Sequence, residues 1–282
     1  MSDVNETITN ASLDVEKITF SDRSLPKVSR FLLGGFHWYS RRLLRKNFNA
    51  VRVARGSQPA IASDQSLVCF VNHPGWWDPL LAFLTNQLCF PGRVVFTPID
   101  QQSLAQYPVF RQLGFYGIEM DSIEGARQFL GVTRQLLLNP TTAIWVTPGG
   151  AFSDVRRRTK FQPGLAHIAA SKQKATLLPV AFEYVFWEER TPEALIEFGE
   201  PIEIQRQRQS KSQWQNFLEE RLAQTQASLA EKAVARDYKT FDLLLSGSAG
   251  VGGGYDLVRR TKAILRRQSF DPRHCRGEGV PS

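Results

Sequence analysis

At 282 residues, the chain is long enough to bury one domain core, and its 42% hydrophobic content excludes an intrinsically disordered protein. The net charge of +8 indicates an anionic partner: nucleic acid, an anionic lipid surface or the phosphates of an acyl carrier. No apolar stretch is long enough to cross a bilayer, and the N-terminus lacks the basic start and apolar run of a secretory signal.

The first helix is predicted over Pro26–Asn47, after a polar segment, residues 1–24, that we expect to be a mobile tail. This helix mixes aromatic residues, among them Phe31, Trp38 and Tyr39, with arginine and lysine. Such a mixture fits a helix that lies in a membrane interface. It fits equally well a helix that packs on the domain core through its apolar stripe.

Strand and helix patterns alternate through the middle of the chain. This alternation predicts an α/β domain over residues 25–245, with a mixed, mostly parallel sheet flanked by helices. The predicted helices cover residues 80–88, 123–138, 165–171 and 211–238. The predicted strands cover residues 51–54, 67–71, 93–97, 115–120, 142–146, 176–182, 194–198 and 201–204.

The last part of the chain, residues 246–282, is predicted to be a glycine-rich hinge with a basic extension. The run Gly247–Gly254 lacks the Lys-Ser/Thr pair of a phosphate-binding loop and follows a helix pattern. The three cysteines have no metal-ligand spacing, so no metal site is predicted. Cys69 and Cys89 are expected to be buried, which fits a reduced cytosolic compartment.

A histidine and an aspartate mark the junction between a predicted strand and a predicted helix. His73 follows the apolar run 67–71, and Asp78 with Pro79 is expected to cap the next helix, Asp78 as N-cap and Pro79 as its first residue. Ligands of open α/β sheets bind at this edge. A carboxylate that holds one imidazole nitrogen leaves the other free to take a proton from a substrate hydroxyl. Ordinary helix capping explains the same spacing, so the pair alone does not decide the function.

Segments downstream place glycine-bearing turns at further strand ends. Pro148, Gly149 and Gly150 follow the strand 142–146, and such a turn lets backbone approach a ligand and exposes N–H groups. Backbone N–H groups near Pro74–Trp76 or Gly149–Gly150 are candidates for stabilising an oxyanion. The run Arg156–Arg158 either holds phosphate or carboxylate groups or is a solvated loop.

In order and spacing, these segments resemble the glycerolipid and lysophospholipid acyltransferase superfamily over about residues 60–205. The family's Asn-His-x4-Asp motif is matched in full by Asn72, His73 and Asp78. Its other motifs are matched in part by Gly117, Ile118, Asp121, Pro148, Gly150, Ser153, Phe161, Gly164 and Pro179. The resemblance implies a glycerol-3-phosphate acyltransferase-like fold, with His73 as general base and Asp78 as its orienting carboxylate. The substrate-binding residues expected with them are Asn72, Gly75, Asp121, Pro148, Gly149, Gly150, Ser153 and Arg156.

Two arginines that the family uses to hold an acceptor phosphate are replaced here. Ser122 stands for the arginine of the second motif and Phe152 for that of the third. Gly149 and Ala151 replace that motif's glutamate and threonine. The Pro-Gly-Gly form looks more like acyltransferases that act on neutral lipid alcohols, so the resemblance favours an acceptor other than a glycerol phosphate.

The resemblance implies O-acyl transfer from acyl-CoA or acyl carrier protein to a lipid hydroxyl, without a further cofactor. The expected location is cytoplasmic, peripheral on the inner face of the membrane, through basic and aromatic residues. The non-enzymatic alternative is a lipid-binding protein on the same scaffold. A serine hydrolase is disfavoured because no Gly-x-Ser-x-Gly elbow occurs, and a nucleic-acid-binding module because no recognition motif occurs.

Overall fold

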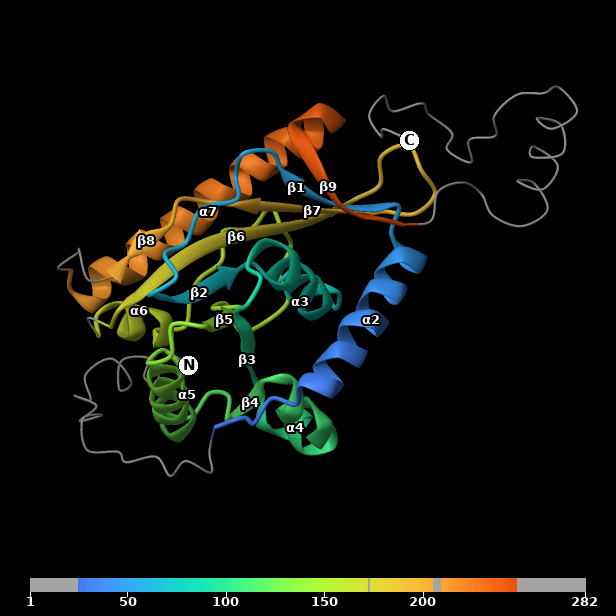
Figure 1. Ribbon diagram of the computed structural model, residues 1–282. Helices are drawn as coiled ribbons and strands as arrows, with labels where there is room; N and C mark the ends of the chain where they lie inside the picture. Colours follow the sequence, from blue (N-terminus) through green and yellow to red (C-terminus); the bar gives the residue numbers. More distant parts are fainter. Residues whose placement is uncertain (1–24, 172, 205–208, 248–282) are drawn as a thin grey trace, which may run out of the picture.

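The computed structural model describes residues 25–171, 173–204 and 209–247, which form a sheet with helices on both faces (Figure 1). The strands are β1 (Ala50–Ala54), β2 (Ser66–Val71), β3 (Val94–Asp100), β4 (Phe115–Ile118), β5 (Thr142–Val146), β6 (Ala175–Val185), β7 (Glu193–Phe198), β8 (Ile202–Glu203) and β9 (Phe241–Ser246). The helices are α2 (Arg30–Asn47), α3 (Asp78–Cys89), α4 (Gln101–Gln106), α5 (Ile123–Leu136), α6 (Gly164–Ala169) and α7 (Lys211–Ala235), with 3-10 helices at Pro108–Leu113 and Tyr238–Thr240.

The sheet has the strand order β4-β3-β5-β2-β6-β7-β1-β9, with β8 paired to β6. All neighbours from β4 to β6 are parallel, and so are β1 and β7. The pairs β6–β7, β6–β8 and β1–β9 are antiparallel. The prediction of a mixed, mostly parallel sheet is therefore confirmed. The carboxyl ends of β2, β3, β4, β5 and β6 meet at one edge, where open α/β sheets bind ligands.

Apolar side chains fill both faces of the sheet, because successive residues of a strand point to opposite sides. In β2, Leu67, Cys69 and Val71 pack with α2 and α3, whereas Val68 and Phe70 pack with α5, α6 and α7. Both faces of β2 are buried, as its continuous apolar run predicts. Cys69 and Cys89 are free and buried, as expected.

Pro179 lies inside the central strand β6, where proline is normally excluded because it cannot donate a ladder hydrogen bond. Here β6 is paired on one side with β2, in which Pro179 faces Phe70. On the other side β7 pairs only from Val180 onward, and β8 pairs at Thr176 and Leu177. Pro179 occupies the gap between β7 and β8, so its missing N–H leaves no partner unsatisfied on that side.

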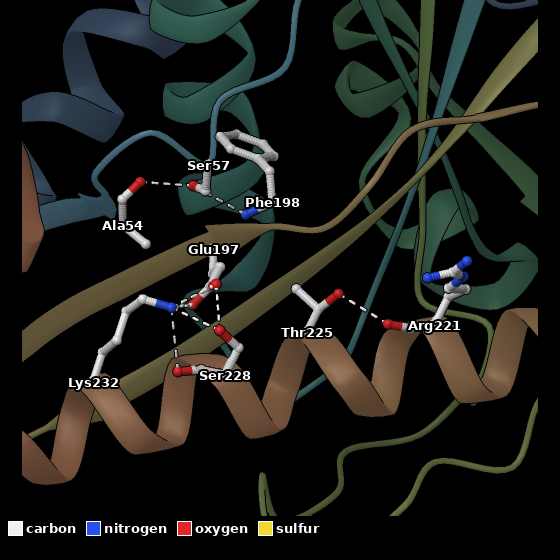
Figure 2. Close-up of polar contacts among 8 residues, drawn as sticks. All are labelled: Ala54, Ser57, Glu197, Phe198, Arg221, Thr225, Ser228 and Lys232. Carbon is white, nitrogen blue, oxygen red and sulfur yellow. Dashed lines mark hydrogen bonds and ion pairs between the residues drawn. The ribbon is translucent and has the colours of Figure 1, made fainter.

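Helix α7 lies along the sheet over β6 and β7, and polar contacts supplement its apolar stripe (Figures 1 and 2). The Glu197 carboxylate of β7 accepts bonds from the Lys232 ammonium at 2.8 and 3.0 Å and from the Ser228 hydroxyl at 2.7 Å. Glu197 is buried, and this pairing offsets the cost of removing its charge from water.

Several elements differ from the sequence-based expectation. The strand predicted over 115–120 ends at Ile118, and the helix predicted over 211–238 ends at Ala235. Strand β9, helix α4 and the 3-10 helix Pro108–Leu113 were not predicted. The predicted N-terminal tail, most of the glycine-rich hinge and the basic extension lie outside the described residues.

Candidate active site

His73 lies just beyond the carboxyl end of β2, and Asn72 fixes the backbone at that point. The Asn72 side chain donates to the carbonyl oxygen of Phe182 at 2.9 Å and accepts the N–H of Phe182 at 2.8 Å. These two bonds continue the contact between β2 and β6 after the last backbone pair, Val71 with Val180. Because Asn72 is buried and both amide atoms are occupied, its visible role is to position His73. Its predicted contact with substrate stays a prediction.

The imidazole of His73 and the carboxylate of Asp78 are directly bonded. Nδ1 of His73 lies 2.5 Å from Oδ2 of Asp78, and the Gly75 N–H donates to the same oxygen at 3.1 Å. The Asp78 side chain is only 2% exposed, whereas that of His73 is 20% exposed. A buried carboxylate that accepts Nδ1–H selects the tautomer whose Nε2 is an acceptor.

The expectation that Asp78 is the N-cap was wrong by one position. Helix α3 begins at Asp78, the capping position is Trp77, and no side chain caps the helix. Pro79 is therefore the second helical residue. The Asp78 carboxylate points back to Gly75 and His73 instead of to the N–H groups of the following turn. The charge still lies in the first turn, where the helix dipole favours a negative group.

The loop after β5 reaches His73 through two consecutive residues. The Ser153 N–H donates to the backbone carbonyl of His73 at 2.9 Å. The ring of Phe152 lies 4.4 Å from the His73 ring, centroid to centroid, with 54° between the planes. Phe152 is 62% exposed, so it forms an apolar wall beside the imidazole at the surface. The structure thus brings Gly75, Asp78 and Ser153 to His73, together with the unexpected neighbour Phe152.

The predicted turn Pro148–Gly150 forms, and the backbone explains both glycines. Gly150 has a φ of +74°, which side-chain-bearing residues rarely adopt. A Cβ on Gly149 would lie 2.6 Å from Cγ2 of Thr159, too close for ordinary packing. The carbonyl of Pro148 accepts the N–H of Gln162 at 2.8 Å. The conformation and packing of the turn thus explain Gly149 and Gly150 without a substrate. Contacts of Pro148, Gly149 and Gly150 with substrate stay predictions.

Some of the backbone N–H groups that were expected to stabilise an oxyanion already donate hydrogen bonds within the protein. The Gly75 N–H donates to Asp78, and the Gly150 N–H donates to the carbonyl of Thr147 at 3.0 Å. Pro74 has no N–H. Within the two candidate segments, Trp76 and Gly149 therefore remain as possible donors to an oxyanion.

Asp121 and Arg156 do not belong to the set of residues in contact with His73. Asp121 is exposed after β4 with a φ of +57°. The Arg156 guanidinium binds the Asp154 carboxylate through two bonds of 2.8 and 2.6 Å, and its side chain is exposed. The same guanidinium holds the pKa of Asp154 well below its usual range. Arg158 in turn pairs with Glu220 at 2.6 Å. Two of the three arginines of this loop are thus partly neutralised by carboxylates.

Sequence reasoning missed Tyr184, whose hydroxyl donates to Oδ1 of Asp78 at 2.5 Å. Tyr184 lies near the end of β6, on the same face as Phe182, which Asn72 holds. The available signal was its place, two residues after Phe182 at the end of a strand parallel to β2. No local motif pointed to it.

Comparisons with known proteins agree with this fold. The acyltransferase family model matches residues 50–183, which include the strand ends around His73. The chain resembles the crystal structure of the 1-acyl-sn-glycerophosphate (LPA) acyltransferase PlsC from Thermotoga maritima, with a TM-score of 0.51 and 15% sequence identity. This likeness covers 71% of this chain and 80% of that chain. A comparison of the sequence with curated proteins found no match.

The matched segment, residues 50–183, identifies the protein as an acyltransferase. The fold of the chain is like that of a glycerolipid acyltransferase. In the part of the chain that the structure describes, no helix is long and apolar enough to span a membrane. Within the same part, no group of three or more His, Cys, Asp or Glu side chains is placed to hold a metal ion.

Proposed function

We propose that the protein transfers a fatty acyl group from a thioester, acyl-CoA or acyl carrier protein, to a lipid hydroxyl, with His73 as general base. The observation that carries this proposal is the bond between His73 Nδ1 and the buried Asp78 carboxylate beside an exposed imidazole edge. A binding protein needs no such base. The pair occurs at the carboxyl edge of the parallel strands, in the segment that matches the acyltransferase model.

In the proposed mechanism, the reaction proceeds in two steps. Nε2 of His73 takes the proton of the acceptor hydroxyl as its oxygen attacks the thioester carbonyl carbon. The tetrahedral intermediate then collapses and breaks the carbon–sulfur bond, and the departing thiolate takes the proton back from His73. Asp78 stabilises the imidazolium between the two steps. The products are an ester and a free thiol, and no acyl-enzyme forms.

We propose a neutral lipid alcohol as the acceptor. The residue beside His73 is Phe152, where the family's phosphate-holding arginine is expected. Ser122, at the other replaced position, caps α5 by accepting the Gly125 N–H at 2.9 Å. Arg156 and Arg158 are paired with carboxylates. A phosphate bound beside His73 would lie against the apolar ring of Phe152.

Incubating purified protein with labelled acyl-CoA and a membrane lipid extract tests the function and the acceptor together. We expect mass spectrometry to identify a new ester of a neutral lipid or glycolipid, formed with release of free CoA. Phosphatidate as the main product would contradict the neutral acceptor and leave acyl transfer intact. With acyl carrier protein as donor in a parallel reaction, failure of both donors to acylate any lipid would favour the alternative, a lipid-binding protein.

We further propose that α2 holds the protein at the cytoplasmic face of a membrane. Phe31, Trp38 and Tyr39 are exposed on this helix, Trp38 by 66%, and the Arg42 guanidinium lies 5.9 Å from the Trp38 ring. The opposite side packs on the core through Leu44 and on α3, where Phe36 meets Phe83. The exposed face of α2 therefore supports a membrane-binding helix, and its opposite face supports a helix that packs on the domain core. Aromatic rings with flanking cations suit the headgroup region of anionic lipids.

Replacing Phe31 and Trp38 together with serine is expected to weaken binding to anionic vesicles about tenfold, since each exposed ring contributes apolar area to the interface. Cosedimentation with phosphatidylserine-containing vesicles measures the bound fraction. The matched control replaces Leu138 and Val234 with serine. Both are exposed apolar residues outside α2, so this variant should bind vesicles like the wild type. Equal binding by the two double variants would argue against α2 as the membrane-binding element. Stronger salt-sensitive binding to DNA than to vesicles would indicate a nucleic acid partner instead.

A further inference from the structure

We infer that Tyr184 is a positioning residue for the reaction, and that it acts on His73 through the Asp78 carboxylate. This inference rests on the proposed role of His73 as general base. It adds a third side chain, from a strand far along the chain, to the His73–Asp78 pair. No part of it requires Tyr184 to touch the substrate.

The Asp78 carboxylate accepts hydrogen bonds on both of its oxygens. Oδ2 takes the His73 Nδ1–H and the Gly75 N–H, and Oδ1 takes the Tyr184 hydroxyl at 2.5 Å. With donors on both sides, the carboxylate plane cannot turn about its Cβ–Cγ bond without losing a bond. The direction of Oδ2, and with it the orientation of the imidazole, is therefore fixed from the far side by Tyr184.

The position of Tyr184 is itself fixed by the sheet. Its backbone is paired with Ala194 of β7 in the antiparallel ladder. Two residues earlier, Phe182 is held by the Asn72 amide, so the ends of β2 and β6 keep a constant register. The Tyr184 ring also packs against Phe48, with 5.6 Å between the ring centroids. A donor anchored in this way is preorganised, and its bond to Asp78 costs little entropy to form.

The hydroxyl of Tyr184 stays a donor throughout the working pH range. Burial, followed by the charge of Asp78 and the bond to it, raises the pKa of Tyr184 well above its ordinary value. The phenol therefore remains protonated while His73 gains and loses its proton. Without this donor, Oδ1 would be a buried carboxylate oxygen with no partner, because the Asp78 side chain is only 2% exposed. The carboxylate is then expected to reorient or to draw in water, and it would take the imidazole with it.

Tyr184→Phe tests this inference because it removes the hydroxyl and keeps the ring that packs on Phe48. We expect kcat for CoA release to fall about tenfold, a part of what a general base contributes, with KM for acyl-CoA within about twofold. In protein labelled with 15N-histidine, NMR reports the protonation of each ring nitrogen, and His73→Gln assigns the His73 signals. We expect the variant to show an increased fraction of the Nε2–H tautomer. The matched control is Tyr116→Phe, which removes a buried tyrosine's 2.9 Å bond to Thr133 on the opposite face of the sheet.

A fall in kcat together with a change in the His73 nitrogen signals, neither of them present in Tyr116→Phe, supports the inference. A fall in kcat with His73 signals like those of the wild type overturns it, because Tyr184 would then act only through packing. Unchanged kcat overturns it as well. If the wild-type protein transfers no acyl group while its His73 signals respond to Tyr184→Phe, the failure lies in the proposed function, and Tyr184 still positions the pair.

Discussion

Replacing His73 with alanine is expected to lower kcat for acyl transfer by about a thousandfold, within the range that a positioned general base contributes. The remaining rate would come from binding and orientation of the two substrates. Because the His73 side chain is partly exposed and Asp78 keeps its bonds from Gly75 and Tyr184, we expect the fold to be retained. CoA release, followed with a thiol reagent, measures the rate, and circular dichroism checks the fold.

The control for this variant is His167→Ala. It removes a half-buried histidine of α6, which is not hydrogen-bonded to Asp78 and lies far from it in the sequence. Burial and the charges of Lys211 and Arg134 lower the pKa of His167, as expected for a structural imidazole that stays neutral. We expect acyl transfer by His167→Ala to remain within about threefold of the wild type. Activity of His73→Ala at that same level would exclude His73 as the base.

Asp78→Asn is expected to lower kcat by about a hundredfold, less than the loss of the base itself, because Asp78 acts through His73. The amide keeps the size of the side chain but offers an NH2 group to one of its neighbours. If that group faces Nδ1 of His73, the imidazole must carry its proton on Nε2, where it cannot act as a base. The loss should appear in kcat more than in KM, because Asp78 is buried and lies behind the histidine.

Asp64→Asn serves as the matched control, since Asp64 forms an exposed ion pair with Lys174. Exposed pairs contribute little to stability, so both the fold and the activity should be kept. A loss in Asp78→Asn that is no larger than in Asp64→Asn would contradict the orienting role. A thermal unfolding midpoint measured for both variants separates a chemical effect from a folding defect.

The fold class was predictable because the central strands and the long helices have clear periodicity. Strand β2 is buried on both faces and reads as one apolar run, and α5 shows an apolar stripe at helical spacing. Strand β9 was not predicted, because an edge strand with exposed Asp242 and Leu243 lacks both patterns. Its strand conformation depends on pairing with β1, a partner far away in sequence. Local propensity is a weak guide for such segments.

The candidate site was predictable only where it is local. His73, Asp78 and Gly75 lie within six consecutive residues, and the strand before them and the helix after them set their relative positions. Arg156 was predicted to bind substrate, which stays a prediction, and the structure pairs its guanidinium with Asp154, two residues away. That prediction concerned the loop's charge, and charge alone does not say which anion a guanidinium binds. The expected N-cap was misplaced by one position, and the Asp78 carboxylate accepts bonds from His73, Gly75 and Tyr184.

The sequence by itself determined the chemistry at the end of β2: an imidazole, a carboxylate five residues later, and the α/β frame that brings such a pair to a sheet edge. Only the tertiary structure decided what surrounds that pair. Tyr184 is 106 residues from Asp78, Phe182 is 110 residues from Asn72, and Phe152 comes from the loop after β5. These contacts depend on the register of β2 with β5 and β6, which is set by packing across the whole sheet. No local pattern encodes that register, so the partners of Asp78 and the apolar wall beside His73 became visible only in the folded chain.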